Sequence, residues 1–299
     1  MTWERAVYVD ADYDTFELCT WSQVCYTVLG HSRMGDTINA GCDPHLLLAA
    51  EILRWPYETC AHIIKDPTSP YYYQLKAMRQ TAKHCNFGFM GGLGVNAFID
   101  LVFKMSNERL DPIWAQHLRN LWFQTWPEAR EYFHWIKSLH GHCVQLFVDR
   151  VRSGATFCQS ANTMFQGLAA DITNLAGWLI TGACYTGELL IPRGHFHTSQ
   201  TSRGARNRER SERMYHYALQ NAHIMLGSRP VNYIHDEFLL ECPESLGHEV
   251  AEELVRLMLL AAEPFTPDVK IGASPCLMRY FSKEAKPIYK EGRLTPWPE

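Results

Sequence analysis

Apolar residues alternate at the start of the chain and then change to a helical spacing. Val7-Tyr8-Val9 predicts a short strand, and from Phe16 to about Val28 apolar residues recur at three- and four-residue intervals. The same helical spacing recurs at about 46–53, 72–90 and 160–180, and at 110–140 as two amphipathic helices interrupted at Pro127. Long helices therefore dominate the first two thirds of the chain.

The last third carries the signals of strands. Two short apolar runs, 231–234 and 238–242, flank the sequence His-Asp-Glu at 235–237, which is typical of antiparallel strands that meet at a tight acidic turn. One further strand is predicted at 269–272, and the many prolines after it predict irregular chain.

Composition sets the class of protein. The chain has 299 residues, 46% of them hydrophobic, and a net charge of −4, so it folds around a sizeable core and is not a uniformly basic nucleic-acid binder. Ten cysteines contain no C-x-x-C pair, which excludes a zinc ribbon and a small disulfide scaffold. With neither an export signal nor a membrane anchor, we expect a reducing cytoplasm, in a bacterial cell or a phage-infected host.

Two carboxylates are candidates for metal binding. Asp12 follows the first strand and Asp236 lies in the acidic turn, so a sheet that pairs the two strands brings both side chains to one edge. Carboxylates with waters and substrate phosphates suit Mg²⁺, and such a pair can hold two ions for in-line phosphoryl transfer. The alternative for each residue alone is an aspartate that caps a turn.

Two helical segments carry candidate ligand-binding side chains. Arg79, Lys83 and Phe87 are four residues apart and share one helix face, which could hold a triphosphate at one end and a base at the other. Asn162 and Gln166 place two amides side by side, and amides can read groove acceptors of nucleic acids. The alternatives are a solvated face beside a core phenylalanine, and amides that cap a helix or are satisfied in the core.

Five short motifs occur in a fixed order: ADYDTFEL (11–18), GCDPH (41–45), RQTAKHCNFG (79–88), ANTMFQGLAAD (161–171) and HDE (235–237). Together they resemble the palm and fingers of family A DNA polymerases, the group of bacterial DNA polymerase I and many phage replicative enzymes. The resemblance extends to about Ser274. It implies an α+β fold, with an antiparallel palm sheet formed by residues 1–35 and 149–299 and α-helical fingers formed by residues 36–148.

The resemblance also implies roles for individual residues. Asp12 and Asp236 would hold two Mg²⁺ ions, with Mn²⁺ as an alternative, and Tyr13 would offer its backbone carbonyl. Glu17 would be a steric gate that excludes a ribose 2′-hydroxyl. The other implied roles are triphosphate binding for His45, Arg79 and Lys83, protonation of the leaving pyrophosphate for Lys83, contact with the incoming sugar and base for Phe87, primer and template contacts for Asn162, Gln166 and His235, and a catalytic place near the primer end for Glu237.

The implied function is template-directed addition of deoxynucleotides to a primer 3′ end. Single-subunit RNA polymerases share the Arg-x-x-x-Lys helix, but they lack the glutamate gate and usually carry a tyrosine eight residues after the lysine. Here Glu17 is present and the tyrosine position is Gly91, which favours DNA synthesis. The alternative is a catalytically incomplete or inactive subunit that binds DNA or serves as a replication scaffold.

The chain departs from the family pattern in several places. Gly91 replaces the tyrosine that most family A enzymes keep, and Cys19 and Cys158 replace two arginines. Residues 193–213 carry six arginines against two glutamates, which predicts either a phosphate-binding segment or a solvated loop. No thumb or exonuclease domain is expected in front of Asp12, so we expect either a second polypeptide that carries the thumb and upstream palm or a truncated product.

Overall fold

The computed structural model describes residues 5–107, 109–187 and 222–298. Two compact units are distinguished by the contacts within each. The sheet unit comprises Met1–Phe16, Leu168–Pro267 and Ile271–Glu299, and the helical unit comprises Glu17–Gly167 and Asp268–Lys270. These bounds differ from the predicted functional division into palm and fingers, and that division stays a prediction.

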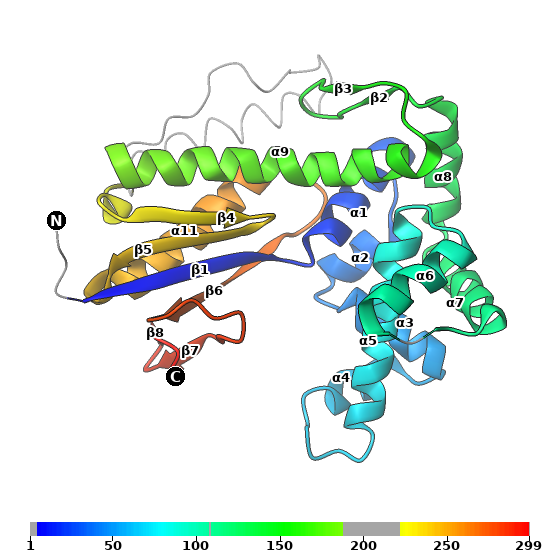
Figure 1. Ribbon diagram of the computed structural model, residues 1–299, viewed down its shortest axis with the longest axis horizontal. Coiled ribbons are helices and arrows are strands. Elements are labelled where there is room, and N and C mark those ends of the chain that lie inside the picture. The colour runs from blue at the N-terminus through cyan, green and yellow to red at the C-terminus, as the bar shows by residue number, and fades with distance from the viewer. Residues whose placement is uncertain (1–4, 108, 188–221, 299) are drawn as a thin grey trace. The chain divides into compact units, whose positions relative to one another are not determined.

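A four-stranded antiparallel sheet forms the centre of the sheet unit (Figure 1). Its strands lie in the order β4 (Arg229–Ile234), β5 (Glu237–Pro243), β1 (Ala6–Asp14) and β6 (Gly272–Met278). The predicted strands at 7–9, 231–234 and 238–242 are thus confirmed, and each is longer than its apolar run. Together with the helices, this sheet confirms the α+β class.

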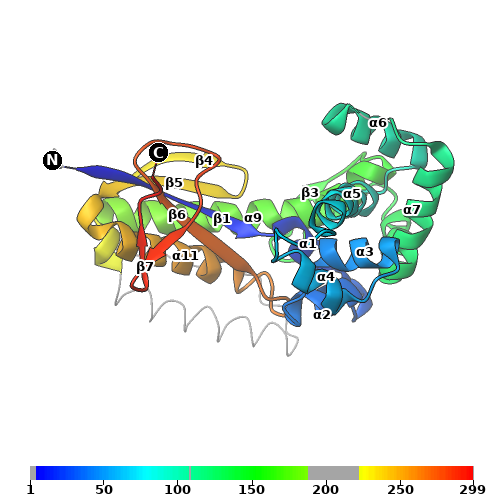
Figure 2. The same cartoon turned by 90° about the horizontal axis from the view of Figure 1, so that it is seen from below.

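Strand β1 has one buried and one open face. Its side chains alternate, so that Val7, Val9, Ala11 and Tyr13 are buried. Helix α11 (Gly247–Ala262) packs on this side of the sheet, where the hydroxyl of Tyr13 donates to the carbonyl of Met258 at 2.6 Å (Figure 2). The acidic residues between the apolar ones therefore share the opposite face.

The predicted strand at 269–272 is wrong, because β6 begins where that prediction ends. The residues before β6 belong to the helical unit, in which the backbone N–H of Lys270 donates to the side-chain oxygen of Asn39 at 2.8 Å. That backbone group is therefore not available to a sheet. The tail is also less irregular than expected, since β7 (Ile288–Lys290) and β8 (Arg293–Thr295) form a small hairpin.

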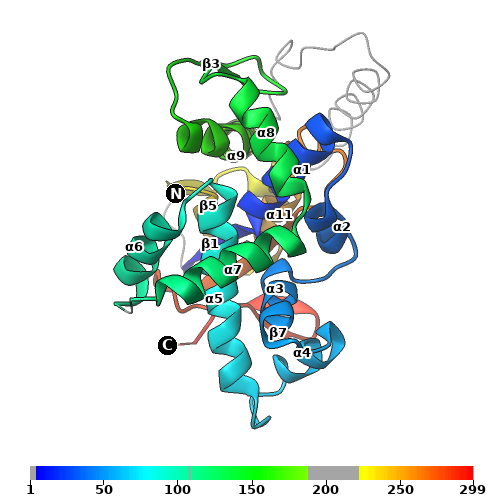
Figure 3. The ribbon, with the colours of Figure 1, turned by 90° about the vertical axis from the view of Figure 1, so that its right-hand side faces the viewer.

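The helical unit consists of short and medium helices (Figure 3). Aromatic rings form its core. The rings of Trp21, Trp122 and Tyr132 meet there, with Trp21 5.7 Å from Tyr132 and 6.4 Å from Trp122 between ring centroids. The elements are α1 (Phe16–Leu29), α2 (Arg33–Asn39), α3 (Pro44–Leu53), α4 (Tyr57–Ile63), α5 (Tyr72–Met90), α6 (Val95–Ser106), α7 (Pro112–Thr125), α8 (Glu128–Ser138), β2 (Cys143–Val144) and β3 (Val151–Arg152).

Most of the predicted helices are confirmed. Helix α5 ends before Gly91, and the interruption at Pro127 separates α7 from α8. The helix expected at 160–180 is α9 (Phe157–Thr186), which is longer at both ends. Four further α-helices of the described chain were not predicted from the sequence: α2, α4, α6 and α11.

All ten cysteines are free thiols. Cys42 and Cys158 are partly exposed, and the other eight are buried. None of the helices in the described part of the chain is long and apolar enough to cross a membrane.

Candidate active site

A group of carboxylates lies on the open face of the sheet unit. In the β1–β5 pairing, Asp12 stands opposite Glu237, the first residue of β5. Asp236 immediately precedes it in the two-residue turn between β4 and β5, where His235 has a left-handed φ of 58°. Two segments more than two hundred residues apart in sequence are therefore brought together, as the predicted strand pairing requires.

Burial of these carboxylates, and to a smaller extent their mutual repulsion, raises their pKa values. Desolvation, followed by the charges of Asp236 and Glu237, raises the pKa of Asp12 to about 6. Desolvation also raises the pKa of Asp236. A cluster of like charges of this kind is stabilised by a proton or by a cation.

Asp10 belongs to the same group and was missed in the sequence. Desolvation and then the charge of Glu237 raise its pKa to about 7, and its Oδ1 is buried without a hydrogen-bond partner in the described structure. The signal that could have found it is the alternation of Asp10, Asp12 and Asp14, which places all three on one face of a strand.

The donor set fits a divalent cation whose coordination is completed by other ligands. In the described residues, no three or more His, Cys, Asp or Glu side chains form a ready metal cage. Asp12 and Asp236 nevertheless supply carboxylate oxygens, and the raised pKa of each indicates that the described residues compensate its charge incompletely. Mg²⁺ is usually bound in this way, through one or two carboxylates together with substrate phosphates and waters.

Three of the predicted ligand-binding side chains lie on α5 of the helical unit. The Nε of Arg79 donates to Oδ2 of Asp43 at 2.6 Å. Lys83 is exposed, has no acidic partner in the described structure, and holds its Nζ 5.8 Å from the centre of the Phe87 ring. Of the two cations, Lys83 is therefore the one whose charge remains available to an anionic ligand.

His45, at the start of α3, is almost fully buried, with 3% of its surface exposed. Its ring centre lies 5.6 Å from that of Phe87. Burial lowers its pKa to about 4; the nearby cations Arg79 and Lys83 act in the same direction, and Asp43 opposes them. The ring is therefore neutral at pH 7.

Two amides of α9 make contacts within the helical unit. The Nε2 of Gln166 donates to Oε1 of Glu17 at 3.1 Å. The Nδ2 of Asn162 donates to two backbone carbonyls, of Gly91 at 3.2 Å and of Cys158 at 2.8 Å. Both amide hydrogens of Asn162 are thereby used inside the protein, so the predicted contact of this residue with nucleic acid would have to use its Oδ1.

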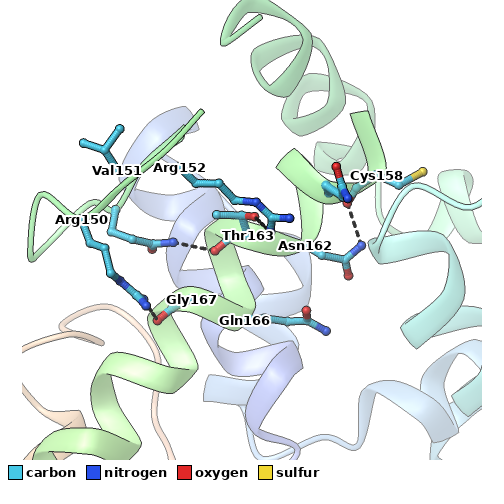
Figure 4. A pocket seen from close by; sticks show the side chains of 10 residues that line it. Arg150, Val151, Arg152, Cys158, Asn162, Thr163, Gln166 and Gly167 are labelled. Atoms are coloured by element: carbon cyan, nitrogen blue, oxygen red, sulfur yellow. Dashed lines mark hydrogen bonds between the residues drawn. The ribbon is translucent and has the colours of Figure 1, made fainter. Parts of the chain in front are cut away.

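A cavity of about 600 Å³ opens beside these amides (Figure 4). Arg150 donates to the carbonyl of Gly167 at 3.1 Å, and Arg152 donates to the hydroxyl of Thr163 at 2.8 Å. The lining residues are Gln145, Arg150, Val151, Arg152, Cys158, Gln159, Asn162, Thr163, Gln166 and Gly167. Sequence reasoning identified two of them and missed the basic residues, whose place depends on the β2–β3 hairpin.

The arginine-rich segment 193–213, for which phosphate binding or a solvated loop was predicted, lies outside the described residues.

Comparisons with known proteins give matches among solved structures. No protein-family model and no curated protein matches the chain. Among solved structures, the chain is similar to the polymerase domain of Pol1 from M. smegmatis in complex with DNA primer-template and dNTP, with a TM-score of 0.56 and 18% sequence identity. The match covers 92% of this chain and 40% of the other. At this identity the likeness shows the fold, which is the α+β fold of a polymerase domain.

Proposed function

We propose that the chain catalyses template-directed DNA synthesis by adding deoxynucleotides to a primer 3′ end, as part of a family A polymerase. The observation that carries this proposal is the strand pairing that aligns Asp12 with Glu237 and brings Asp236 beside them. The likeness in fold to a polymerase domain gives independent support.

In this proposal the carboxylates of Asp12 and Asp236, with the backbone carbonyl of Tyr13, hold two Mg²⁺ ions. Bound ions of this kind lower the pKa of the attacking hydroxyl and neutralise charge on the leaving pyrophosphate. The raised pKa values of both aspartates support the assignment, because burial, the main cause, penalises their unpaired charges and a bound cation would offset that cost together with the smaller repulsion.

The helical unit would bind the nucleotide. Lys83 and Arg79 attract the triphosphate, and Lys83 is a cation that can give its proton to the departing pyrophosphate. His45 is neutral, so it contributes a hydrogen bond rather than a charge. The ring of Phe87 packs against the incoming sugar and base, and the carboxylate of Glu17, held by Gln166, excludes a 2′-hydroxyl.

Asn162, Gln166 and His235 would contact primer and template, and Glu237 would act near the primer end. A second polypeptide that carries a thumb and the upstream palm stays a prediction. So does the assignment of residues 1–35 and 149–299 to a palm and 36–148 to fingers.

The test is primer extension by the purified chain with Mg²⁺. Asp12→Asn and Asp236→Asn should each reduce incorporation at least about a hundredfold, because the metals supply several kcal/mol of transition-state stabilisation. Glu284→Gln removes an exposed carboxylate from the same unit and should leave activity unchanged.

Two results would contradict the proposal. Substantial activity in either aspartate variant would exclude the two-metal assignment. A wild-type chain that binds primer-template but incorporates nothing would favour the inactive DNA-binding subunit instead.

A further inference from the structure

Two arginines of the helical unit lie against one phenylalanine ring. Arg119, on α7, holds its guanidinium carbon 4.9 Å from the centre of the Phe123 ring, and Arg130, on α8, holds its own at 4.6 Å. A guanidinium group stacks on an aromatic face more readily than an ammonium group does. The ring therefore holds two like charges close together.

The arrangement continues along α8 to a third cation. Lys137 lies seven residues after Arg130 and so shares its helix face. Its Nζ lies 5.9 Å from the centre of the Phe157 ring. Phe133 joins the two ring contacts, with its centre 5.9 Å from that of Phe123 and 5.5 Å from that of Phe157. We call Arg119, Arg130 and Lys137 the cation row.

The charges of the cation row are not neutralised within the described structure. None of the three residues forms an ion pair there, whereas Arg109 in the same unit lies 4.0 Å from Asp100. Among the residues that the structure describes, the buried Nε of Arg119 has no hydrogen-bond acceptor. Desolvation and then repulsion from Arg130 lower the pKa of Arg119.

The acidic residues of α8 make their contacts elsewhere. Oε1 of Glu128 accepts hydrogen bonds from the hydroxyl of Ser32 and the N–H of Met34, and Glu131 lies 3.3 Å from His31. No acidic residue of the described chain therefore compensates the row, and its charges are available to an anionic ligand.

The exposed parts of the row select the chemistry of that anion. Phe123 is only 7% exposed, so a base cannot stack on its ring, and the cations above it are the groups that a ligand meets. At the other end of the row, the ring of Phe157 packs closely against Gly92, which follows the end of α5. A Cβ added to Gly92 would lie only 2.8 Å from this ring. The row thus runs toward the helix that carries Arg79 and Lys83.

We propose that the cation row binds the phosphate backbone of a single nucleic-acid strand as that strand approaches the end of α5. The three cations contact successive phosphates, and the rings beneath them hold the side chains in place. That the strand is an unpaired template rests on the proposed function.

The test measures binding of the full chain to a fluorescent oligodeoxythymidylate by anisotropy, at several salt concentrations and without nucleotides or metal. Each lost phosphate contact should reduce the slope of log K against log salt by about 0.7. We expect this reduction in Arg130→Gln and in Lys137→Gln, which alter exposed residues, and also in Arg119→Gln. Arg109→Gln removes one positive charge from an acid-paired arginine and should leave the slope unchanged.

The outcomes separate this inference from the proposed function. Wild-type binding with an unchanged slope in Arg130→Gln and Lys137→Gln would overturn the cation row alone. Absence of wild-type binding to any DNA would overturn the proposed function as well. Equal binding of a polyglutamate peptide, weakened by the same variants, would replace the nucleic acid by an acidic protein partner.

Discussion

The amide of Asn86 determines which nitrogen of His45 carries the proton. Its Oδ1 accepts hydrogen bonds from the indole nitrogens of Trp122 and Trp126, each at 3.0 Å. The amide nitrogen must therefore face Nδ1 of His45, at 2.9 Å, and that ring nitrogen can only accept. The proton of the neutral ring lies on Nε2.

This arrangement predicts a loss of stability in acid. The pKa of His45 is about 4 in the folded chain and about 6.5 when unfolded, so the unfolded chain binds the proton more tightly. The contribution of His45 to the free energy of unfolding is fully present above pH 6.5, and this contribution falls by about 3 kcal/mol as the pH drops to 4. The free energy of unfolding, measured with urea, should depend less on pH over this range in His45→Gln than in wild type. His62→Gln, at an exposed position, should behave like wild type.

Asp43 has two functions that substitution can separate. Its Oδ1 caps α3 through the N–H groups of His45 and Leu46, and its Oδ2 holds Arg79. Asp43→Ala should lower the free energy of unfolding by about 1–2 kcal/mol, and Asp43→Asn by less, because asparagine is also a good cap.

If Arg79 binds the triphosphate, as proposed, Asp43 competes with the substrate for this arginine. Release of this arginine in Asp43→Asn should lower KM for deoxynucleotides by about fivefold, equivalent to about 1 kcal/mol. Steady-state kinetics of single-nucleotide insertion is the measurement. A raised KM would mean that Asp43 positions Arg79 for the substrate instead.

Gly91 and Asn162 should show coupled effects on stability. A Cβ on Gly91 would lie 2.8 Å from Oδ1 of Asn162 and 2.9 Å from its Nδ2, so Gly91→Ala must displace that amide from its two carbonyl partners. We expect a loss of about 1–2 kcal/mol. In an Asn162→Ala background the same change should be nearly neutral, because the clash is gone and the backbone φ of −76° suits alanine. Additive losses in a double-mutant cycle would contradict this.

The contact between Glu17 and Gln166 predicts two degrees of lost sugar selection. If Glu17 is the steric gate, as proposed, Glu17→Ala should raise ribonucleotide incorporation relative to deoxynucleotide incorporation by about tenfold or more, because the substitution removes the obstacle to a 2′-hydroxyl. Gln166→Leu should act in the same direction but less, since it only releases the carboxylate. The measurement is the ratio of kcat/KM for ribonucleotides to kcat/KM for deoxynucleotides. An unchanged ratio in Glu17→Ala would show that residues other than Glu17 discriminate between the two sugars.

Local patterns were sufficient for much of the fold. The apolar run at 7–9 predicted the first strand, the two runs around His235 predicted an antiparallel pair, and Gly91 marked the end of α5. Helix α11 could have been predicted as well, because Val250, Leu254 and Leu257 have helical spacing.

The remaining errors come from contacts distant in sequence. The start of β6 depends on the side chain of Asn39, which holds the backbone of Lys270. In the candidate site, the nearness of Asp12 and Asp236 followed from strand pairing. The contact of the Asn162 amide with the carbonyl of Gly91 could not be predicted, since Gly91 lies 71 residues away along the chain.

The distribution of thiols makes the protein a natural subject for site-selective labelling. Burial raises the pKa of Cys184 and Cys242 to about 12, and eight of the ten sulfurs are shielded from reagents. A maleimide dye should therefore attach first at Cys42 and Cys158. The former precedes the cap of α3 and the latter lines the cavity beside Asn162. With one of these two changed to serine, a single fluorophore could report separately on nucleotide arrival at α3 or on occupancy of the cavity.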